Sequence, residues 1–333
     1  MTLDTIEQVK KYLIVEGLVR SDDNVQVEYL PGGVSCRVWK IVRNNDRWVI
    51  KQALKKLDVK ADWFSDVERI HREHHVMKQI KRIVPDSNVP KVLHTDYTNH
   101  VYMMSCAEEG VETWKDLLIS GIFNASTAKS AASLLSQIHS RSYKIDEEQK
   151  AEFSDQKYFN QLRIDPFHRF LIQKYPELTS AINKLIAELT LEKSCLVHGD
   201  FSPKNMLVQQ NGEIVLIDFE VAHWGNPVFD LAYCLGHLML KAWHLKKYEE
   251  VLSLIRAFLY NYKGKVSNLL PHLGLMLLAR MDGKSPVNYI QDEDLKQIIR
   301  MVAIGWIKNE VPDTHVIDAI EQQFNLRSKL QSI

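Results

Sequence analysis

His-Gly-Asp-Phe-Ser-Pro-Lys-Asn at residues 198–205 and Leu-Ile-Asp-Phe-Glu at residues 216–220 are the two motifs that decide the fold. The apolar runs 206–208 and 214–217 are separated by Asn211-Gly212, a dipeptide typical of a tight turn between antiparallel strands. The sequence therefore predicts a hairpin whose strand pairing brings the end of the first motif towards the second.

The side chains at this hairpin suit phosphate and metal chemistry. Strand pairing brings Asn205 and Asp218 together, and protein-bound Mg²⁺ takes one or two carboxylates together with the phosphate oxygens of a substrate. An amide oxygen is also an acceptable ligand. Asp200, on the loop before the hairpin, faces the same cleft and is free to orient or deprotonate a hydroxyl group. We therefore predict Asn205 and Asp218 as metal ligands and Asp200 as a catalytic residue.

The spacing of these residues is similar to that of a known superfamily. Asn205 follows Asp200 by five residues and Asp218 follows it by eighteen, while Gly225 and residues 229–232, Phe-Asp-Leu-Ala, extend the pattern. This pattern resembles the aminoglycoside phosphotransferase and choline kinase superfamily, which has a protein-kinase-like fold. The alternative, polar residues that merely turn a hairpin, does not explain several matches at fixed spacing. The resemblance implies ATP, or else GTP, as phosphate donor, Mg²⁺ as the metal and a small-molecule hydroxyl as acceptor.

Such a fold needs a strand lysine for the nucleotide phosphates and a helix carboxylate that holds it. Lys51 is a charge within the apolar run 48–53, and Glu73 lies on a helix face that the apolar spacing predicts to be buried. Because an unpaired buried charge is costly, each residue predicts the other as its partner. The alternative is a solvent-facing lysine, with a neighbouring acid such as Glu68 in the same role.

The resemblance assigns two further segments to the nucleotide. Gly32, Gly33 and Ser35, in a loop between two predicted strands, are expected to cover the phosphates, although adjacent glycines also suit a simple hairpin turn. Ser105 and Ala107 are expected to contact the adenine through their backbone, at the connection between the lobes. The methionines just before them are equally suited to filling a core.

Glu220 and Lys204 complete the set of candidates. Glu220 stands where protein kinases carry a glycine, and the Asp-x-Glu pattern resembles methylthioribose kinases, in which this acid supplies a metal ligand. The resemblance therefore implies Glu220 as a third metal ligand, although Asn205 stands where those kinases have serine. Lys204, a second catalytic candidate, either neutralises the transferred phosphoryl group or lies on the rim of the site.

Three residues near the motifs are expected to be structural. We interpret His198 as a scaffold for the catalytic loop, because the neighbouring carboxylate matches the family's base. We interpret His139 as a satisfied core histidine. Asp230 is expected to cap backbone N–H groups of the catalytic region and to open the following helix.

Candidates for binding the acceptor lie further along the chain. Arginine suits an anionic or hydroxyl-rich acceptor and an acid suits a cationic one, while ion pairs on the surface or between helices are an equal alternative. The candidates are Arg163, Asp165, Arg169, Arg280, Asp282 and Lys284.

Periodicity divides the chain into a sheet-rich and a helical part. Strand-like runs at 25–30, 36–43, 47–53, 91–95 and 100–106 predict a five-stranded sheet that begins as an antiparallel meander. An opening helix with a stripe of Ile6, Val9, Leu13 and Ile14 ends near Gly17, and a second helix spans 63–83. Helical spacing dominates from residue 112, at 114–119, 128–139, 178–189, 229–243 and 252–262.

We therefore expect an α+β, protein-kinase-like two-lobed fold. Its expected parts are a nucleotide-binding lobe at residues 1–105, a hinge at 106–111 and a larger, mainly helical lobe at 112–333. Such a chain, with 42 Lys+Arg against 42 Asp+Glu, lacks the basic excess of a nucleic-acid binder. Four widely spaced cysteines, an acidic N-terminus and the lack of a long apolar run favour a cytoplasmic protein without a membrane partner, either monomer or homodimer.

The sequence thus predicts a small-molecule kinase of the aminoglycoside phosphotransferase type. The alternatives are a sugar kinase like methylthioribose kinase and a non-catalytic nucleotide-binding protein. The second of these would be expected to lack Lys51, Asp200 or Asp218, all of which are present. A protein kinase is disfavoured because Asp218 runs directly into Gly225 and leaves no long activation loop.

Overall fold

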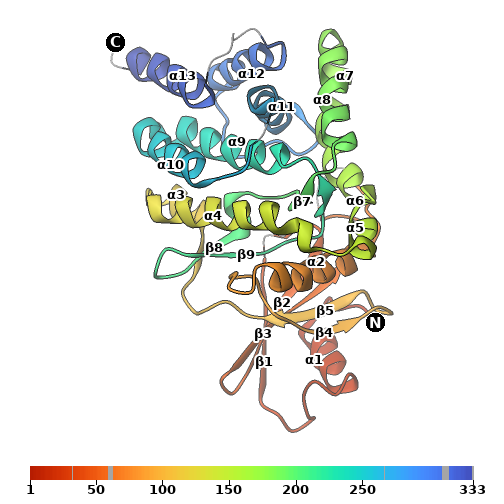
Figure 1. The fold of residues 1–333 in the computed structure, drawn as a ribbon. Coiled ribbons are helices and arrows are strands. Elements are labelled where there is room, and N and C mark those ends of the chain that lie inside the picture. The colour runs from red at the N-terminus through yellow and green to blue at the C-terminus, as the bar shows by residue number, and fades with distance from the viewer. Residues whose placement is uncertain (32, 59–62, 266, 310–314, 332–333) are drawn as a thin grey trace.

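The computed structural model describes residues 1–31, 33–58, 63–265, 267–309 and 315–331. Its N-terminal part is a five-stranded antiparallel sheet in the order β1-β2-β3-β5-β4, and the remainder is mainly helical (Figure 1). This confirms the predicted α+β class and five-stranded sheet. The strands are β1 (Val25–Tyr29), β2 (Cys36–Arg43), β3 (Asp46–Ala53), β4 (Val92–Asp96) and β5 (Val101–Ser105).

The sheet lies between two helices, α1 (Ile6–Val15) and α2 (Arg69–Ile83). Alternate residues of a strand point to opposite faces, so Ile50 packs in the cluster with α1 and Val49 in the cluster with α2. Lys51 follows the same alternation and points to the α2 face, where it meets Glu73. The alternation of β3 therefore places the Lys51 ammonium on the face of the sheet that meets α2.

Two details of the N-terminal helices differ from the prediction. The helix expected over 63–83 begins only at Arg69, because the preceding residues fold back, with a bridge between Lys56 and Phe64. The Trp63 indole N–H donates to the Gln161 carbonyl at 3.1 Å, so its apolar ring serves tertiary packing rather than a helix stripe.

In α1, Val9 and Leu13 are buried as expected, but Ile6 and Ile14 are exposed. Tyr12 takes the buried position instead, because its ring packs on the sheet while its hydroxyl donates to Asp96 at 3.0 Å. An aromatic residue with a polar tip is not distinguished from a surface residue by apolar spacing alone.

The two motifs are flanked by short strands that form two small sheets, between the N-terminal part and the helices. The predicted hairpin is confirmed: β8 (Met206–Val208) pairs antiparallel with β9 (Ile214–Leu216), and Gly212 in the turn has φ +82°. The other short strands are β6 (Glu112–Thr113), which pairs with β8, and β7 (Cys195–Val197), which pairs with β10 (His223–Gly225). Residues 106–111, between β5 and β6, carry neither helix nor strand, and the lobe boundaries stay a prediction.

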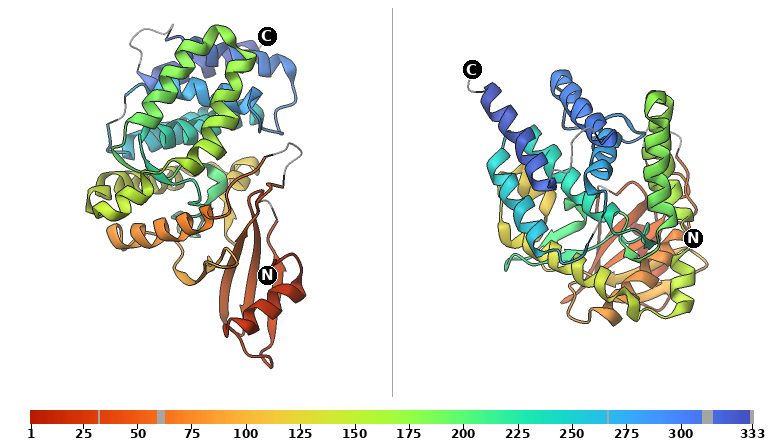
Figure 2. Two further views of the ribbon diagram at one scale, coloured as in Figure 1. Left: turned by 90° about the vertical axis from the view of Figure 1, so that its right-hand side faces the viewer. Right: turned by 45° about the horizontal axis from the view of Figure 1, so that its top comes forward.

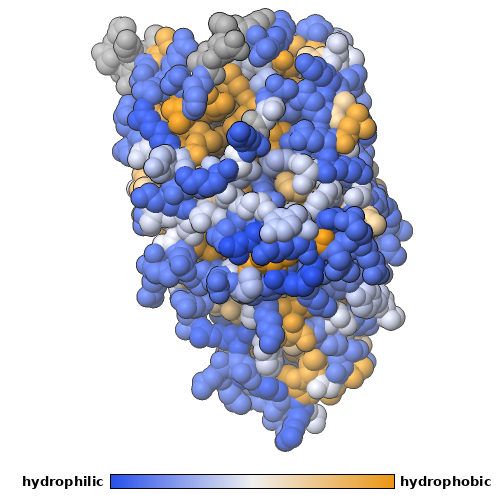
Figure 3. Space-filling model, in the orientation of Figure 1, coloured by the Kyte–Doolittle hydropathy of each residue, from blue (hydrophilic) through white to orange (hydrophobic). Residues whose placement is uncertain are grey.

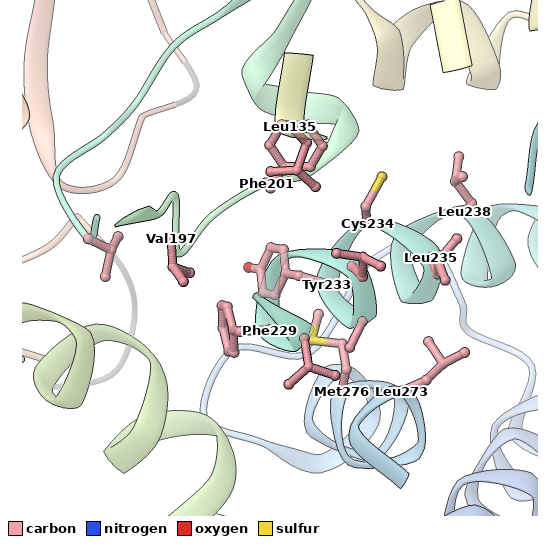
Figure 4. Close-up of a cluster of buried hydrophobic side chains, with 14 of the residues drawn as sticks. Leu135, Val197, Phe201, Phe229, Tyr233, Cys234, Leu235, Leu238, Leu273 and Met276 are labelled. Carbon is pink, nitrogen blue, oxygen red and sulfur yellow. The ribbon is translucent and has the colours of Figure 1, made fainter. Parts of the chain in front are cut away.

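Helices α9 and α11 form the centre of the helical part (Figure 1). In Figure 4, Leu135 and Phe201 lie on one side of α9, and Leu273 and Met276 of α11 lie on the other. The motif that holds Phe201 is thereby anchored to the main core. The helices are α3 (Trp114–Ile119), α4 (Ala125–Arg141), α5 (Glu147–Phe153), α6 (Lys157–Phe159), α7 (Phe170–Lys174), α8 (Thr179–Leu191), α9 (Val228–Leu245), α10 (Tyr248–Asn261), α11 (Leu269–Asp282), α12 (Glu293–Ile307) and α13 (Val316–Gln331).

The sheet lies at one end of the molecule and the C-terminal helices at the other (Figure 2). Hydrophilic residues dominate the face in Figure 3, with apolar residues showing in its upper part and again along its lower right side. Within the described residues, no helix combines the length and apolarity needed to cross a membrane. The four cysteines are free thiols, and all but Cys106 are buried.

Candidate active site

The predicted ion pair between Lys51 and Glu73 is present. The Lys51 ammonium lies 2.7 Å and 3.0 Å from the two Glu73 carboxylate oxygens and 3.0 Å from Oδ1 of Asp218. Both Lys51 and Glu73 are buried. Burial opposes the charge on Lys51, but Asp218 and Glu73 outweigh it and hold the pKa of this ammonium well above its ordinary value.

Asp218 occupies an unusual backbone conformation just after β9. Its φ of +74° lies in the left-handed region, which is costly for a residue other than glycine and which occurs preferentially at functional sites. The next residue, Phe219, donates its N–H to Glu73 at 3.3 Å, so this turn is tied to α2. Burial alone would raise the pKa of Asp218, but Lys51 and Lys204 lower it below its ordinary value.

Asp200 is a buried carboxylate surrounded by donors. The Asn205 amide nitrogen donates to Asp200 Oδ2 at 2.7 Å, and the Lys204 ammonium lies 3.3 Å from the same oxygen. Arg163 lies 3.0 Å from Oδ1. Burial works against the negative charge, but Arg163 and Lys204 together hold the pKa of Asp200 below its ordinary range. The carboxylate is therefore ionised at neutral pH.

Arg163 lies on a π-helix, Asn160–Arg169, that joins α6 to α7. Pro166 within this segment has no N–H to donate, so the regular α-helical hydrogen-bond pattern cannot continue through it. Arg163 is buried and donates to the Gly199 carbonyl at 2.9 Å as well as pairing with Asp200. The sequence singled out Arg163 for the acceptor, and its pairing with the predicted catalytic aspartate was not anticipated.

Asp230 on α9 binds the backbone of the loop that contains Asp200. The carboxylate of Asp230 accepts the N–H of His198 at 2.7 Å and that of Gly199 at 2.9 Å, and His139 lies 3.1 Å from it. Gly199 has φ +77°, and a Cβ there would lie 2.7 Å from the Val221 carbonyl oxygen. The expected cap by Asp230 and the interpretation of His139 as a satisfied core histidine are confirmed.

His198 itself bridges the two motifs. Its Nε2 lies 3.1 Å from the Ile217 carbonyl, and its Nδ1 lies 3.1 Å from the Asp200 N–H. Ile217 also donates its own N–H to the Asn205 carbonyl at 3.1 Å. These contacts bring Asn205 and Asp218 to adjacent positions, as the hairpin predicts.

Glu220 meets a residue that the sequence analysis did not select for the site. Its Oε2 lies 2.9 Å from Nε of Arg69, whose side chain is fully buried at the start of α2. Arg69 also donates to the carbonyls of Ser35 and Leu54, and so joins the loop after β1 to the Asp-Phe-Glu turn. A carboxylate engaged in this way has only its other oxygen for a metal, and a ligand role for Glu220 stays a prediction.

The loop predicted to cover the phosphates is partly described. Gly32 lies outside the described residues, and Gly33 has ordinary space for a side chain, with no neighbour closer than 3.7 Å to an added Cβ. Ser35 is buried, and its carbonyl accepts from Arg69 and from the Leu54 N–H at 2.8 Å. Phosphate contacts of this loop stay a prediction.

At the connection after β5, Ser105 and Ala107 also stay predictions. The Ser105 N–H is donated to the Lys91 carbonyl at 2.9 Å, and its hydroxyl accepts from the Lys91 N–H at 2.9 Å. A nucleotide contact at Ser105 would therefore use its carbonyl oxygen.

The acceptor candidates separate into two groups. Asp165 and Arg169 form an exposed pair on one helix turn, and Asp282 is held by Arg300 at 2.8 Å and 2.9 Å. The guanidinium carbon of Arg280 lies 5.4 Å from the centre of the Phe167 ring. The guanidinium carbon of Arg163 lies 5.6 Å from the same ring centre. Lys284 lies over the Trp63 ring. Arg163 is thus the candidate that contacts Asp200, and Arg280 shares the Phe167 ring with it.

Comparison with known proteins decides the family. A family model described as the phosphotransferase enzyme family matches residues 26–245. The chain belongs to this family. It is therefore a member of a family of small-molecule kinases, as the motifs predicted. Among curated proteins, no sequence matches the chain.

Solved structures support the fold of this phosphotransferase family member. Spectinomycin phosphotransferase APH(9)-Ia, in complex with ADP and spectinomycin, has a TM-score of 0.56 at 14% identity, with 97% of this chain and all of that one covered. Amicoumacin kinase, in complex with AMP-PNP, Ca²⁺ and its ligand, has a TM-score of 0.56 at 12% identity, covering 92% and 97%. Ethanolamine kinase from Plasmodium vivax has a TM-score of 0.54 at 15% identity, covering 98% and 89%.

The donor set of this phosphotransferase fits a divalent metal held jointly with nucleotide phosphates. The Asn205 amide nitrogen is engaged by Asp200, which leaves the amide oxygen as the free ligand atom. Lys51 takes Oδ1 of Asp218, which leaves Oδ2. One amide and one carboxylate oxygen, completed by phosphate and water, match the preference of Mg²⁺ for incomplete protein coordination.

Proposed function

We propose that this protein transfers the γ-phosphate of ATP to a hydroxyl group of a small molecule. The observation that carries the proposal is the position of the Lys51 ammonium, within 3.0 Å of both Glu73 and Asp218. A buried lysine shared by a helix carboxylate and the candidate metal ligand is placed to meet nucleotide phosphates beside the metal. GTP is the alternative donor.

Each side chain then has a defined task. Lys51 binds phosphate oxygens, and Glu73 holds its ammonium in place. Asn205 and Asp218 hold Mg²⁺, which supplies charge neutralisation at the phosphates when it is bound. Lys204, whose side chain is half exposed and within 3.3 Å of Asp200, is placed to offset charge on the transferred group.

Asp200 acts mainly by orienting the acceptor hydroxyl. Its pKa is held below the ordinary range of an aspartate, so it is a weak base. Phosphoryl transfer proceeds through a loose transition state, in which late removal of the hydroxyl proton and accurate in-line placement matter more than strong basicity.

The family and the nucleotide complexes of similar proteins support this function. The spectinomycin phosphotransferase structure contains ADP and its antibiotic, and the amicoumacin kinase structure contains AMP-PNP. The acceptor is selected by side chains of this chain's own site and not by the shared fold.

Calorimetry with ATP and Mg²⁺, followed by ADP release with a panel of alcohols, amino sugars and sugars, tests the proposal. Asp218→Ala should abolish Mg²⁺-dependent nucleotide affinity, whereas Asp22→Ala, at an exposed position between α1 and β1, should leave it unchanged. Unchanged Mg²⁺-dependent affinity in Asp218→Ala would contradict the metal assignment. ATP binding without turnover on any acceptor would favour a non-catalytic nucleotide-binding protein.

A further inference from the structure

Helix α9 carries a buried lysine without an acidic partner. Lys241 is 2% exposed, and its ammonium lies 3.4 Å from the His237 carbonyl, a weak contact one helical turn back. No carboxylate among the described residues lies within ion-pair distance of it. Buried ammonium groups are normally paired, because removing such a charge from water is costly.

A continuous set of side chains connects this lysine to the proposed catalytic aspartate. Arg163, which pairs with Asp200, also lies 5.7 Å from the centre of the Tyr233 ring. Tyr233, His237 and Lys241 are spaced by four residues and so share one face of α9. The Tyr233 and His237 rings are 5.0 Å apart. This face of α9 therefore leads from the catalytic loop to the lysine, over about 12 Å of helix.

Arg280 on α11 lies beside the same line of residues. Its guanidinium approaches the Phe167 ring from 5.4 Å, and Arg163 approaches that ring from 5.6 Å. Its Nη1 donates to the Ser285 carbonyl, but its Nε is buried and has no partner. The hydroxyl of Tyr289, whose ring centre is 5.6 Å from the Lys241 ammonium, is also buried without a partner. Lys241, Arg280 and Tyr289 thus each keep hydrogen-bond donors that no acceptor among the described residues satisfies.

The acids that could balance these cations are engaged elsewhere. Asp282, at the end of α11, is held by Arg300 and by the Tyr175 hydroxyl at 2.7 Å. Asp116 on α3 lies 3.9 Å from Lys115, its own neighbour. The region beyond Asp200 therefore has an excess of positive charge over negative.

Burial already acts on this lysine in the absence of a ligand. Burial, together with smaller contributions from Lys115 and Arg280, lowers the pKa of Lys241 to about 7, while Cys234 and Asp116 oppose this shift. The charged and titratable groups around it are Lys115, Asp116, Cys234, His237, His244, Arg280 and Tyr289. A bound anion would remove the cost of charging Lys241, whereas a cationic ligand would increase it.

We propose that the phosphate acceptor is an anion, namely a small hydroxyl compound that carries a carboxylate or phosphate group. Its negative group binds between Lys241 and Arg280, with the Tyr289 hydroxyl as a further donor, and its hydroxyl reaches Asp200. Guanidinium and ammonium groups are the usual partners of both anions, and the geometry does not depend on which of the two is present. This inference rests on the proposed kinase function and names its substrate class.

Calorimetry on the full chain saturated with AMP-PNP and Mg²⁺ tests the anion site, because the bound nucleotide blocks the phosphate-binding cleft. Glycerol, glycerate and glycerol 3-phosphate are titrated as neutral, carboxylate and phosphate probes of similar size. We expect at least one anionic probe to bind and glycerol to bind at least tenfold more weakly.

Lys241→Met keeps the length of the side chain and removes its charge. This variant should bind the anionic probe at least tenfold more weakly, with unchanged AMP-PNP affinity, whereas Lys241→Arg should stay within about threefold. Lys129→Met, at an exposed position on α4, is the matched control and should resemble the wild type. A melting temperature for Lys241→Met equal to or above that of the wild type shows that lost binding does not reflect unfolding.

Two results would overturn the anion site: neither anion binds to the nucleotide-loaded protein, or both bind equally well to the wild type and to Lys241→Met. Failure to bind AMP-PNP would instead contradict the proposed kinase function. In that case the same titrations into the nucleotide-free wild type and Lys241→Met decide the anion site separately.

Discussion

The two sides of the site differ in how their buried charges are balanced. Around the two motifs, Lys51, Arg69 and Arg163 each meet a carboxylate within 3.0 Å. On the face of α9 proposed for the acceptor, Lys241 meets only a carbonyl at 3.4 Å, and Arg280 keeps a buried N–H without a partner. Balanced charges hold their positions before a ligand arrives, whereas unbalanced ones are costly until a ligand of opposite charge binds. The five predictions below test this contrast.

Replacing Asp200, the acid that Arg163 and Lys204 surround, should have the largest effect, which is on turnover. Asp200→Asn removes the charge that Arg163 and Lys204 surround and the group that orients the acceptor. Turnover should fall on the order of 10²–10⁴-fold with little change in nucleotide affinity. Steady-state kinetics and ATP calorimetry measure both, and full turnover in this variant would exclude Asp200 as the orienting residue.

Replacing Asp230 tests whether its contacts with His198 and Gly199 stabilise the fold. Asp230→Asn leaves fewer acceptors for the buried N–H groups of His198 and Gly199 and for His139, and should lower the free energy of unfolding by roughly 3 kcal/mol. Asp146→Asn, at the exposed start of α5, is the control, because asparagine caps a helix as well as aspartate. Denaturant titration gives both values, and equal losses would refute the scaffold role.

Removing the unpaired charge of Lys241 should raise the free energy of unfolding, whereas removing a paired charge lowers it. With its folded pKa lowered to about 7 and its unfolded value near 10.4, the unfolded chain binds more protons between these pH values. The cost of burying the charge is therefore complete below pH 7 and decreases as pH rises. Ligand-free Lys241→Met should be the more stable protein at pH 7, and its advantage should shrink by about 1.4 kcal/mol per pH unit.

Denaturant titrations at pH 7, 8 and 9 measure the difference in free energy of unfolding between Lys241→Met and the wild type. The contributions of other titrating groups are the same in both proteins and cancel in this difference. An advantage that stays constant with pH would show that Lys241 is not the group that titrates.

The contact between Arg69 and Glu220 should have a moderate effect. A double-mutant cycle with Arg69→Met and Glu220→Gln should give a coupling energy of about 1–2 kcal/mol in unfolding experiments without nucleotide or metal. These conditions separate the ion pair from any metal role of Glu220. Additive losses would show that the 2.9 Å contact contributes nothing of its own.

The smallest effect is expected where both charges face water. Asp165 and Arg169 form an exposed pair one helical turn apart, and removing either should change the free energy of unfolding by about 0.5 kcal/mol or less. Unchanged turnover is expected as well. A large loss of activity would place this pair in the acceptor site and would weaken the contrast between the two sides.

Local pattern was sufficient for much of the site. Asn211-Gly212 predicted the hairpin, because a turn dipeptide between two apolar runs leaves little choice of pairing, although the connection between Val208 and Ile214 is five residues long. Lys51 and Glu73 predicted each other, because each would be a costly buried charge alone. Asp230 was recognised as a cap through the motif in which it stands.

Other features needed contacts between distant segments. Trp63 continues an apolar pattern but packs against Gln161, so the helix starts later than the pattern indicates. Glu220 was assigned to the metal by analogy, and its partner Arg69 is far away in the chain and carries no motif. Pro166, inside a helical stretch near Arg163, indicated an irregular helix at this position. No local pattern showed that Arg163 would meet Asp200.

The sequence by itself determined the fold class, the family and the pairing of Lys51 with Glu73, because those depend on short spacings and on charges placed within apolar elements. Tertiary structure alone decided that Arg163 meets Asp200 and that Lys241 is left without an acid. An arginine or lysine in a helix has the same local pattern whether it meets a carboxylate or not. Only packing α9 against α11 and the π-helix determines where its charge is balanced.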